Sequence, residues 1–208
     1  SKWALQAESP KIPPQWPDSA GETRIRHLMT ITGFEQAGAS LSSIVRTIVF
    51  GRSGNNLISR PVATATGADD RLAIADTGCR CVHLYIPAER KYLKLYAGGP
   101  DEMRSPVGVT FDDELRLYVS DSARGAIDVF DSRGAFVFSL KKAGDAPLKR
   151  PTGLACSPKK KTVFAVDSLA HKIYAFNTKG DLLFSFGERG DKKGQFNFPT
   201  HIDVSPSG

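Results

Sequence analysis

The feature that most constrains this chain is a repeated segment. Three stretches align without gaps, and each has an aspartate at its fifth place, a β-branched residue six places later and an aromatic residue nine places later. The stretches are LAIADTGCRCVHLY (72–85), LYVSDSARGAIDVF (117–130) and VFAVDSLAHKIYAF (163–176). Their aspartates, Asp76, Asp121 and Asp167, lie 45 and 46 residues apart. A repeat of this length is typical of folds that stack one small unit many times, so it constrains the architecture more than any single residue does.

Each repeat has the sequence signals of four short β-strands. A proline opens the first strand, apolar residues alternate over short runs, and DSRG (131–134) and NTKG (177–180) suit hairpin turns with glycine at a positive φ. In the third repeat the predicted strands cover 153–156, 162–166, 172–176 and 182–186.

A four-stranded antiparallel unit of about 45 residues, repeated, predicts an all-β fold, a β-propeller of four-stranded blades. We expect blades over about 60–104, 105–149 and 150–197, with a fourth begun at 198. One blade cannot bury both of its faces, so the core should lie between neighbouring blades, built from Val, Ile, Leu and Phe at alternate positions.

The segment before the blades has a different composition. Residues 1–22 are rich in proline and polar residues, which favours an extended arm. Residues 23–59 are expected to hold a ring-closing strand at 24–31 and a short helix at 40–51, where apolar residues follow helical spacing.

The linker after the third repeat carries a family resemblance. FGERGDKKGQFNFP (186–199) contains Gly194, Phe196 and Pro199 at the spacing Gly-x-Phe-x-x-Pro. With the repeats over 60–208, it resembles the NHL-repeat family, in which such a motif links one blade to the next; the second linker, KKAGDAPLKRP (141–151), lacks the motif. Family propellers usually have six blades, which would need roughly 320 residues. The resemblance therefore implies a natural chain that continues past Gly208.

The opening of the chain, a Trp-Pro pair followed by RIRHL (24–28), is similar to a bacterial, exported and lipoprotein-like subset of that family. The resemblance implies a non-catalytic scaffold, without a cofactor, that binds a protein partner at the cell envelope. The expected location is extracytoplasmic: the periplasm, the outer membrane or the cell surface. The implied partner is a multihaem cytochrome or another exported protein, and a lipid on the N-terminus would attach the chain to a membrane.

The net charge of +6, with a pI of about 9.3, favours anionic partners, although lysines on polar loops are also an ordinary solvated surface. In a four-stranded blade the strand 2–3 turn and the linker to the next blade emerge on one face, and most of the excess positive charge falls in these segments. We take this face as the candidate partner-binding site. Its residues are Arg80, Arg124, Lys141, Lys142, Lys149, Arg150, His171, Lys172, Arg189, Lys192 and Lys193.

The third repeat also holds the letters of a hydrolase triad, Asp167, Ser168 and His171, within five residues. A triad needs a base held against the serine oxygen and an oxyanion hole, which side chains of one tight turn rarely provide. Because the aspartate recurs beside Ser or Thr in every repeat, we interpret it as a turn residue that accepts backbone N–H bonds, rather than as part of a metal or general-base cluster.

Two other functions stay open. A metal-dependent propeller enzyme of the lyase or lactonase type would take its ligands from the inner strands, where His201 is the only histidine and the equivalent positions are Ala63, Gly108 and Gly153. RNA binding through the basic face is the other. It resembles the activity of some animal members of the family, which carry zinc-binding domains upstream. We expect nucleic acid to be the less favoured partner, because these residues include no such domain.

The three cysteines form no recognisable framework. In an extended chain the Cα atoms of Cys79 and Cys81 would be roughly 6.5–7 Å apart, at or beyond the disulfide limit. Two thiols alone are also a poor zinc site. We expect ordinary packed or semi-exposed cysteines here and a buried Cys156 on an inner strand, while the redox state of all three stays open.

Overall fold

A computed structural model describes residues 2–11, 14–16, 25–37, 56–97 and 102–205. The chain divides into two units: Ser1–Ile58 with Glu89–Tyr92, and Ser59–Ala88 with Leu93–Gly208. Within the described ranges, no helix is long and apolar enough to cross a membrane.

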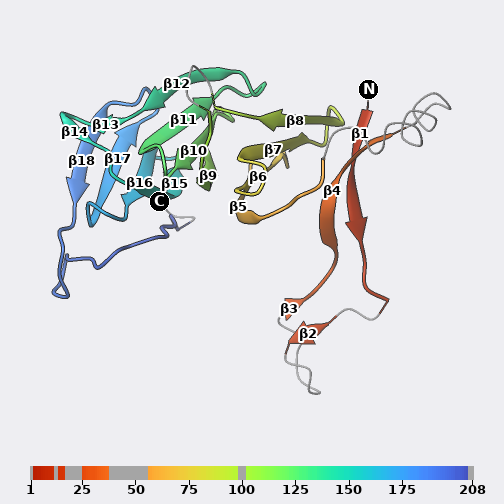
Figure 1. Cartoon of the computed structure of the whole chain (residues 1–208), viewed down its shortest axis with the longest axis horizontal. Helices are drawn as coiled ribbons and strands as arrows, with labels where there is room; N and C mark the ends of the chain where they lie inside the picture. The colour runs from red at the N-terminus through yellow and green to blue at the C-terminus, as the bar shows by residue number, and fades with distance from the viewer. Residues whose placement is uncertain (1, 12–13, 17–24, 38–55, 98–101, 206–208) are drawn as a thin grey trace. The chain divides into compact units, whose positions relative to one another are not determined.

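The first unit is built on a two-stranded antiparallel sheet. Strand β1 (Lys2–Glu8) pairs with β4 (Thr30–Ala37), and β2 (Gln15–Trp16) pairs with β3 (Ile25–Arg26) (Figure 1). The predicted arm is therefore a paired strand over Lys2–Glu8, because backbone N–H and C=O groups of an extended segment find partners in the ladder. The helix predicted over 40–51 lies outside the described residues.

The described residues from 61 to 186 form three four-stranded antiparallel sheets, each with its strands in sequence order, as Figure 1 shows. They belong to the second unit except for Lys91 and Tyr92, at the start of β8. Blade 1 consists of β5 (Pro61–Thr66), β6 (Leu72–Asp76), β7 (Cys81–Ile86) and β8 (Lys91–Leu95). Blade 2 consists of β9 (Pro106–Phe111), β10 (Leu117–Asp121), β11 (Ala126–Phe130) and β12 (Phe136–Leu140). Blade 3 consists of β15 (Pro151–Ser157), β16 (Thr162–Asp167), β17 (Lys172–Asn177) and β18 (Leu182–Phe186). A small hairpin, β13 (Lys142–Ala143) with β14 (Ala146–Pro147), lies in the linker between blades 2 and 3. The predicted all-β fold of repeated four-stranded antiparallel sheets is confirmed.

The core lies between blades, as the alternation of apolar residues predicts. Leu117 and Val119 of β10 belong to a buried cluster shared with blade 1, whereas Tyr118, between them, belongs to a second cluster shared with blade 3. Successive side chains of a strand point to opposite faces, so each central strand supplies both interfaces. Stacking of neighbouring blades is therefore what stabilises each sheet.

The inner strands approach one another closely at glycines. The backbone N–H of Gly153 donates to the Thr200 carbonyl at 2.8 Å, and a Cβ at Gly153 would lie 2.7 Å from that oxygen. A Cβ at Gly108 would clash with the Thr152 carbonyl in the same way. Glycine at these positions allows the first strands of successive blades to pack backbone against backbone.

Candidate functional site

The recurrent aspartate fastens the strand 2–3 turn of each blade to the linker that precedes strand 1. The Asp167 carboxylate accepts backbone N–H bonds from Lys149 at 2.7 Å, from Arg150 at 3.0 Å and from Ala170 in its own turn at 3.1 Å. Asp121 and Asp76 make the equivalent bonds in blades 2 and 1, and all three side chains are fully buried. The prediction of a turn residue is confirmed, and the bonds to the linker are an addition that the sequence did not indicate.

These bonds place the turns and linkers on one face, which we call the linker face. It consists of the strand 2–3 turns, 77–80, 122–125 and 168–171, and the described linker segments, 59–60, 102–105, 141–150 and 187–198. Most of the predicted partner-binding residues are exposed on it. They are Arg80, Lys141, Lys142, Lys149, Arg150, Arg189, Lys192 and Lys193, while Lys172 is partly exposed.

Arg124 is a correction to the predicted set. Its Nη1 atom lies 2.5 Å from Asp128 Oδ2 and 3.9 Å from Asp121 Oδ2, and its side chain is only 6% exposed. Asp128 is completely buried. The guanidinium therefore neutralises internal carboxylates beneath the turn and offers little surface to a partner.

His171 is the second correction. It is buried, its Nδ1 atom accepts the Phe198 backbone N–H at 3.3 Å, and its ring lies 4.6 Å from the Phe198 ring. His171 thus anchors the linker that leaves blade 3. His171 Nδ1 accepts from the linker and the Asp167 carboxylate accepts backbone bonds from the preceding linker and from its own turn, so these two residues of the apparent triad act as parts of a turn.

The fourth residue after the aspartate has the same backbone conformation in every blade, although its type differs. Arg80, Gly125 and His171 occupy this place, with φ of 54°, 60° and 55°. The left-handed conformation is easiest for glycine. The glycine of blade 2 was the sequence signal for this constraint, which sequence reasoning missed.

The inner strands border a cavity of about 750 Å³. His201 and Asp203 line it together with backbone and small side chains of β5, β9 and β15. His201, Asp203 and Cys156 are residues of metal-ligating type in its lining, but among the described residues they do not form a group of donor atoms close enough to share one ion. Cys156 also lines it and is partly buried, and burial raises the pKa of its thiol to about 12, so the thiolate that a nucleophile requires is scarce at neutral pH.

Cys79 and Cys81 form a disulfide, contrary to the expectation of ordinary packed cysteines. Their Cα atoms are 5.3 Å apart. Because Arg80 between them is left-handed, the chain folds back and brings the two Cα atoms within bridging range, which an extended chain would not do.

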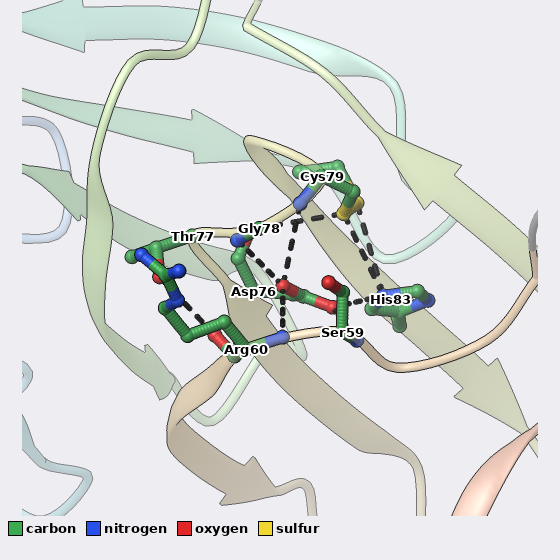
Figure 2. The surroundings of a disulfide bond; sticks show 8 residues. Ser59, Arg60, Asp76, Thr77, Gly78, Cys79 and His83 are labelled. Atoms are coloured by element: carbon green, nitrogen blue, oxygen red, sulfur yellow. Dashed lines mark hydrogen bonds and ion pairs between the residues drawn. A yellow bond between two sulfur atoms is a disulfide. The ribbon is translucent and has the colours of Figure 1, made fainter.

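The disulfide lies against a buried pair of Asp76 and His83 (Figure 2). His83 Nε2 is 3.2 Å from Asp76 Oδ2. Burial would raise the pKa of Asp76, but hydrogen bonds from the Ser59 and Arg60 backbone outweigh it and lower that pKa to about 2. Burial lowers the pKa of His83 even though Asp76 opposes the shift. The ring is therefore neutral at physiological pH and the carboxylate is ionised.

Asp167→Ala should lower the free energy of unfolding by about 2 kcal/mol, because three backbone N–H groups lose a charged acceptor and regain only part of that energy from water. Asp181→Ala is the control, since its carboxylate is exposed and accepts a hydrogen bond from the side chain of Asn177 in the same hairpin turn. It should change stability by under about 0.5 kcal/mol. Urea denaturation of both variants measures the difference, and equal values would contradict the fastening role of Asp167.

Comparisons with known proteins bear on the fold. No family model matches the chain, and no curated protein matches its sequence. Virginiamycin B lyase from Staphylococcus aureus superposes with a TM-score of 0.58 at 13% identity, over 74% of this chain and 48% of that chain. A streptogramin B lyase gives 0.55 at 11% identity, over 70% and 45%, and hydrazine synthase of Kuenenia stuttgartiensis gives 0.56 at 18% identity, over 71% and 40%. This chain spans less than half the length of each of these structures. At such identities the likeness shows the fold alone: the chain is a β-propeller of four-stranded antiparallel blades.

Proposed function

We propose that this protein is a non-catalytic, NHL-type propeller scaffold that binds an acidic protein partner through its linker face. The observation that carries the proposal is the grouping of exposed lysines and arginines on that face, fixed in place by the aspartate turns. Exposed cations there outnumber the exposed carboxylates of the same described segments, Glu102, Asp145, Glu188 and Asp191. Complementary potentials of this kind steer association and select partners by charge.

The rigidity of the linker face supports a docking role. The linker after blade 3 is held by its own contacts: the Phe196 backbone N–H donates to the Glu188 carbonyl at 2.8 Å, and Gln195 Nε2 donates to Glu188 Oε1 at 2.7 Å. Phe196 also packs on Phe186 at 6.1 Å between ring centroids. A loop ordered before binding loses less conformational entropy when a partner arrives.

The disulfide supports an extracytoplasmic location. Structural disulfides persist in oxidising compartments such as the periplasm and the cell exterior, and they are rare in the cytosol. The Cys79–Cys81 bridge fits such a compartment. We propose the cell envelope as its location and an exported protein, such as a multihaem cytochrome, as its partner.

Charge reversal on the linker face tests this function. Lys192→Glu with Lys193→Glu should abolish capture of the partner from an envelope extract of the producing cells, because both ammonium groups are exposed there. Lys160→Glu with Lys179→Glu changes the same charge in turns at the opposite ends of the strands and should leave capture intact. Haem staining of the captured protein tests for a cytochrome.

Two results would count against the proposal. The first is capture that both charge-reversed proteins retain equally. The second is tight, salt-sensitive binding of single-stranded RNA by the purified protein that the linker-face variant loses, which would make nucleic acid the partner.

A further inference from the structure

Blade 1 gathers soft metal-ligating atoms beneath its strand 2–3 turn. The Cys79 Sγ and Cys81 Sγ atoms lie 3.7 Å and 3.8 Å from the same atom, His83 Nε2. The three donor atoms all lie within 4.8 Å of one another. Cys81 and His83 are completely buried, and Asp76 Oδ2 is 3.2 Å from the same histidine nitrogen. Three donors therefore lie close together beneath the turn, and the buried Asp76 carboxylate lies beside the histidine among them.

The fold itself does not require these residue types. The places three, five and seven residues after the turn aspartate hold Cys79, Cys81 and His83 in blade 1, Arg124, Ala126 and Asp128 in blade 2, and Ala170, Lys172 and Tyr174 in blade 3. Blade 2 fills the same space with a buried ion pair. The chain thus builds this turn in three ways, and only blade 1 supplies a set of sulfur and imidazole ligands.

The separations between His83 Nε2 and the three neighbouring donor atoms match those in a tetrahedral zinc site. Bonds of about 2.3 Å to sulfur and about 2.05 Å to nitrogen, at tetrahedral angles, place sulfur and nitrogen about 3.6 Å apart, and nitrogen and oxygen about 3.4 Å apart. In this structure His83 Nε2 lies 3.7 and 3.8 Å from the two sulfurs and 3.2 Å from Asp76 Oδ2. For a tetrahedral site the two sulfurs would have to move to about 3.8 Å from each other and to about 3.6 Å from Asp76 Oδ2, and rotation about the cysteine Cα–Cβ bonds is the motion that brings them there. We propose that the dithiol form of this protein binds one Zn²⁺ ion through Cys79, Cys81, His83 and Asp76.

The disulfide form becomes the zinc form in two steps. An oxidising compartment keeps the bridge closed, so the dithiol form needs a reductant there: a dithiol supplies two electrons and two protons to the bridge and becomes a disulfide itself. Zn²⁺ then displaces both thiol protons, and the ring proton of His83 moves to Nδ1 so that Nε2 offers its lone pair. Asp76 Oδ2 keeps its bond from the Ser59 N–H, at 2.6 Å, and directs a second lone pair at the ion.

A cavity borders the cluster on one side. It has a volume of about 260 Å³ and is lined by Cys79, Arg80, Tyr96, Ala97, Glu102 and Met103. Cys79 is partly exposed, so it is the ligand that a cation in this cavity would meet first.

Cobalt titration tests the proposal. The full-length protein is reduced with dithiothreitol, freed from it under nitrogen and titrated with Co²⁺. We expect one Co²⁺ per chain, with a thiolate-to-cobalt charge-transfer band and the intense visible bands of tetrahedral cobalt. Zn²⁺ should abolish these bands by displacement, and the oxidised protein should show none.

Two variants separate the site from general thiol chemistry. The triple change C79R/C81A/H83D copies the blade 2 residues into blade 1, so it should fold, as circular dichroism checks, and lose the cobalt bands completely. Cys156→Ser removes the free thiol outside the cluster and should leave the bands unchanged. An octahedral spectrum for the reduced wild-type protein would overturn the proposal, as would tetrahedral bands that survive the triple change or disappear with Cys156→Ser.

Discussion

Phe176→Ala should lower the free energy of unfolding by about 3–5 kcal/mol. Phe176, on β17, is only 1% exposed and belongs to the cluster that joins blades 2 and 3. Removal of its ring deletes apolar contacts on both sides of the interface and leaves a cavity that two rigid sheets cannot close. Urea denaturation followed by fluorescence and by circular dichroism measures the loss.

Phe136→Ala is the matched control. This phenylalanine lies on the outer strand β12, is 39% exposed and contacts Phe130 only edge to face at 6.1 Å. Its truncation should cost about 1 kcal/mol or less, because much of the ring stays in water in the folded state. If the two variants lost the same stability, the inter-blade interface would not be the main core.

Arg124→Ala should lower the free energy of unfolding by about 3–5 kcal/mol, which is a large effect for a residue in a turn. The substitution leaves the completely buried Asp128 carboxylate without its partner, whose Nη1 atom lies 2.5 Å away in the native protein. Removing one partner of a buried ion pair lowers stability far more than replacing both partners by apolar residues. Thermal and urea unfolding measure the difference from wild type.

The double variant Arg124→Met with Asp128→Leu checks this explanation. It removes both charges and keeps apolar volume beneath the turn, so it should recover most of the stability that Arg124→Ala loses. If the double variant were as unstable as the single one, packing of the arginine side chain, and not charge compensation, would be its contribution.

Much of the fold can be predicted from the sequence because the same spacing and alternation recur in every repeat. The spacing of Asp76, Asp121 and Asp167 gives the period of the blades, and the alternation around residues 117–119 shows which side chains face each neighbour. The third-blade strands agree with the predicted ranges within two residues at each end. Local periodicity carries this information, since both strand pleating and blade stacking act on nearest neighbours.

The candidate site was harder to predict. The sequence predicts Arg124 and His171 to be surface residues of polar turns, yet both side chains are buried. Arg124 pairs with Asp128, and His171 packs against Phe198. Their partners come from the next strand and from a linker 27 residues away. Charge and polarity in a sequence indicate exposure only on average, because a buried partner reverses that expectation.

The sequence alone determined that this protein is a stack of four-stranded β-units whose aspartates close their turns, because these properties depend on spacing within one repeat. Only the tertiary structure decided that Cys79 and Cys81 are bridged and lie against His83 and Asp76. The physical reason is the left-handed backbone at Arg80, which folds the chain back on itself. A conformation of one residue leaves no periodic signal, yet it decides which side chains meet.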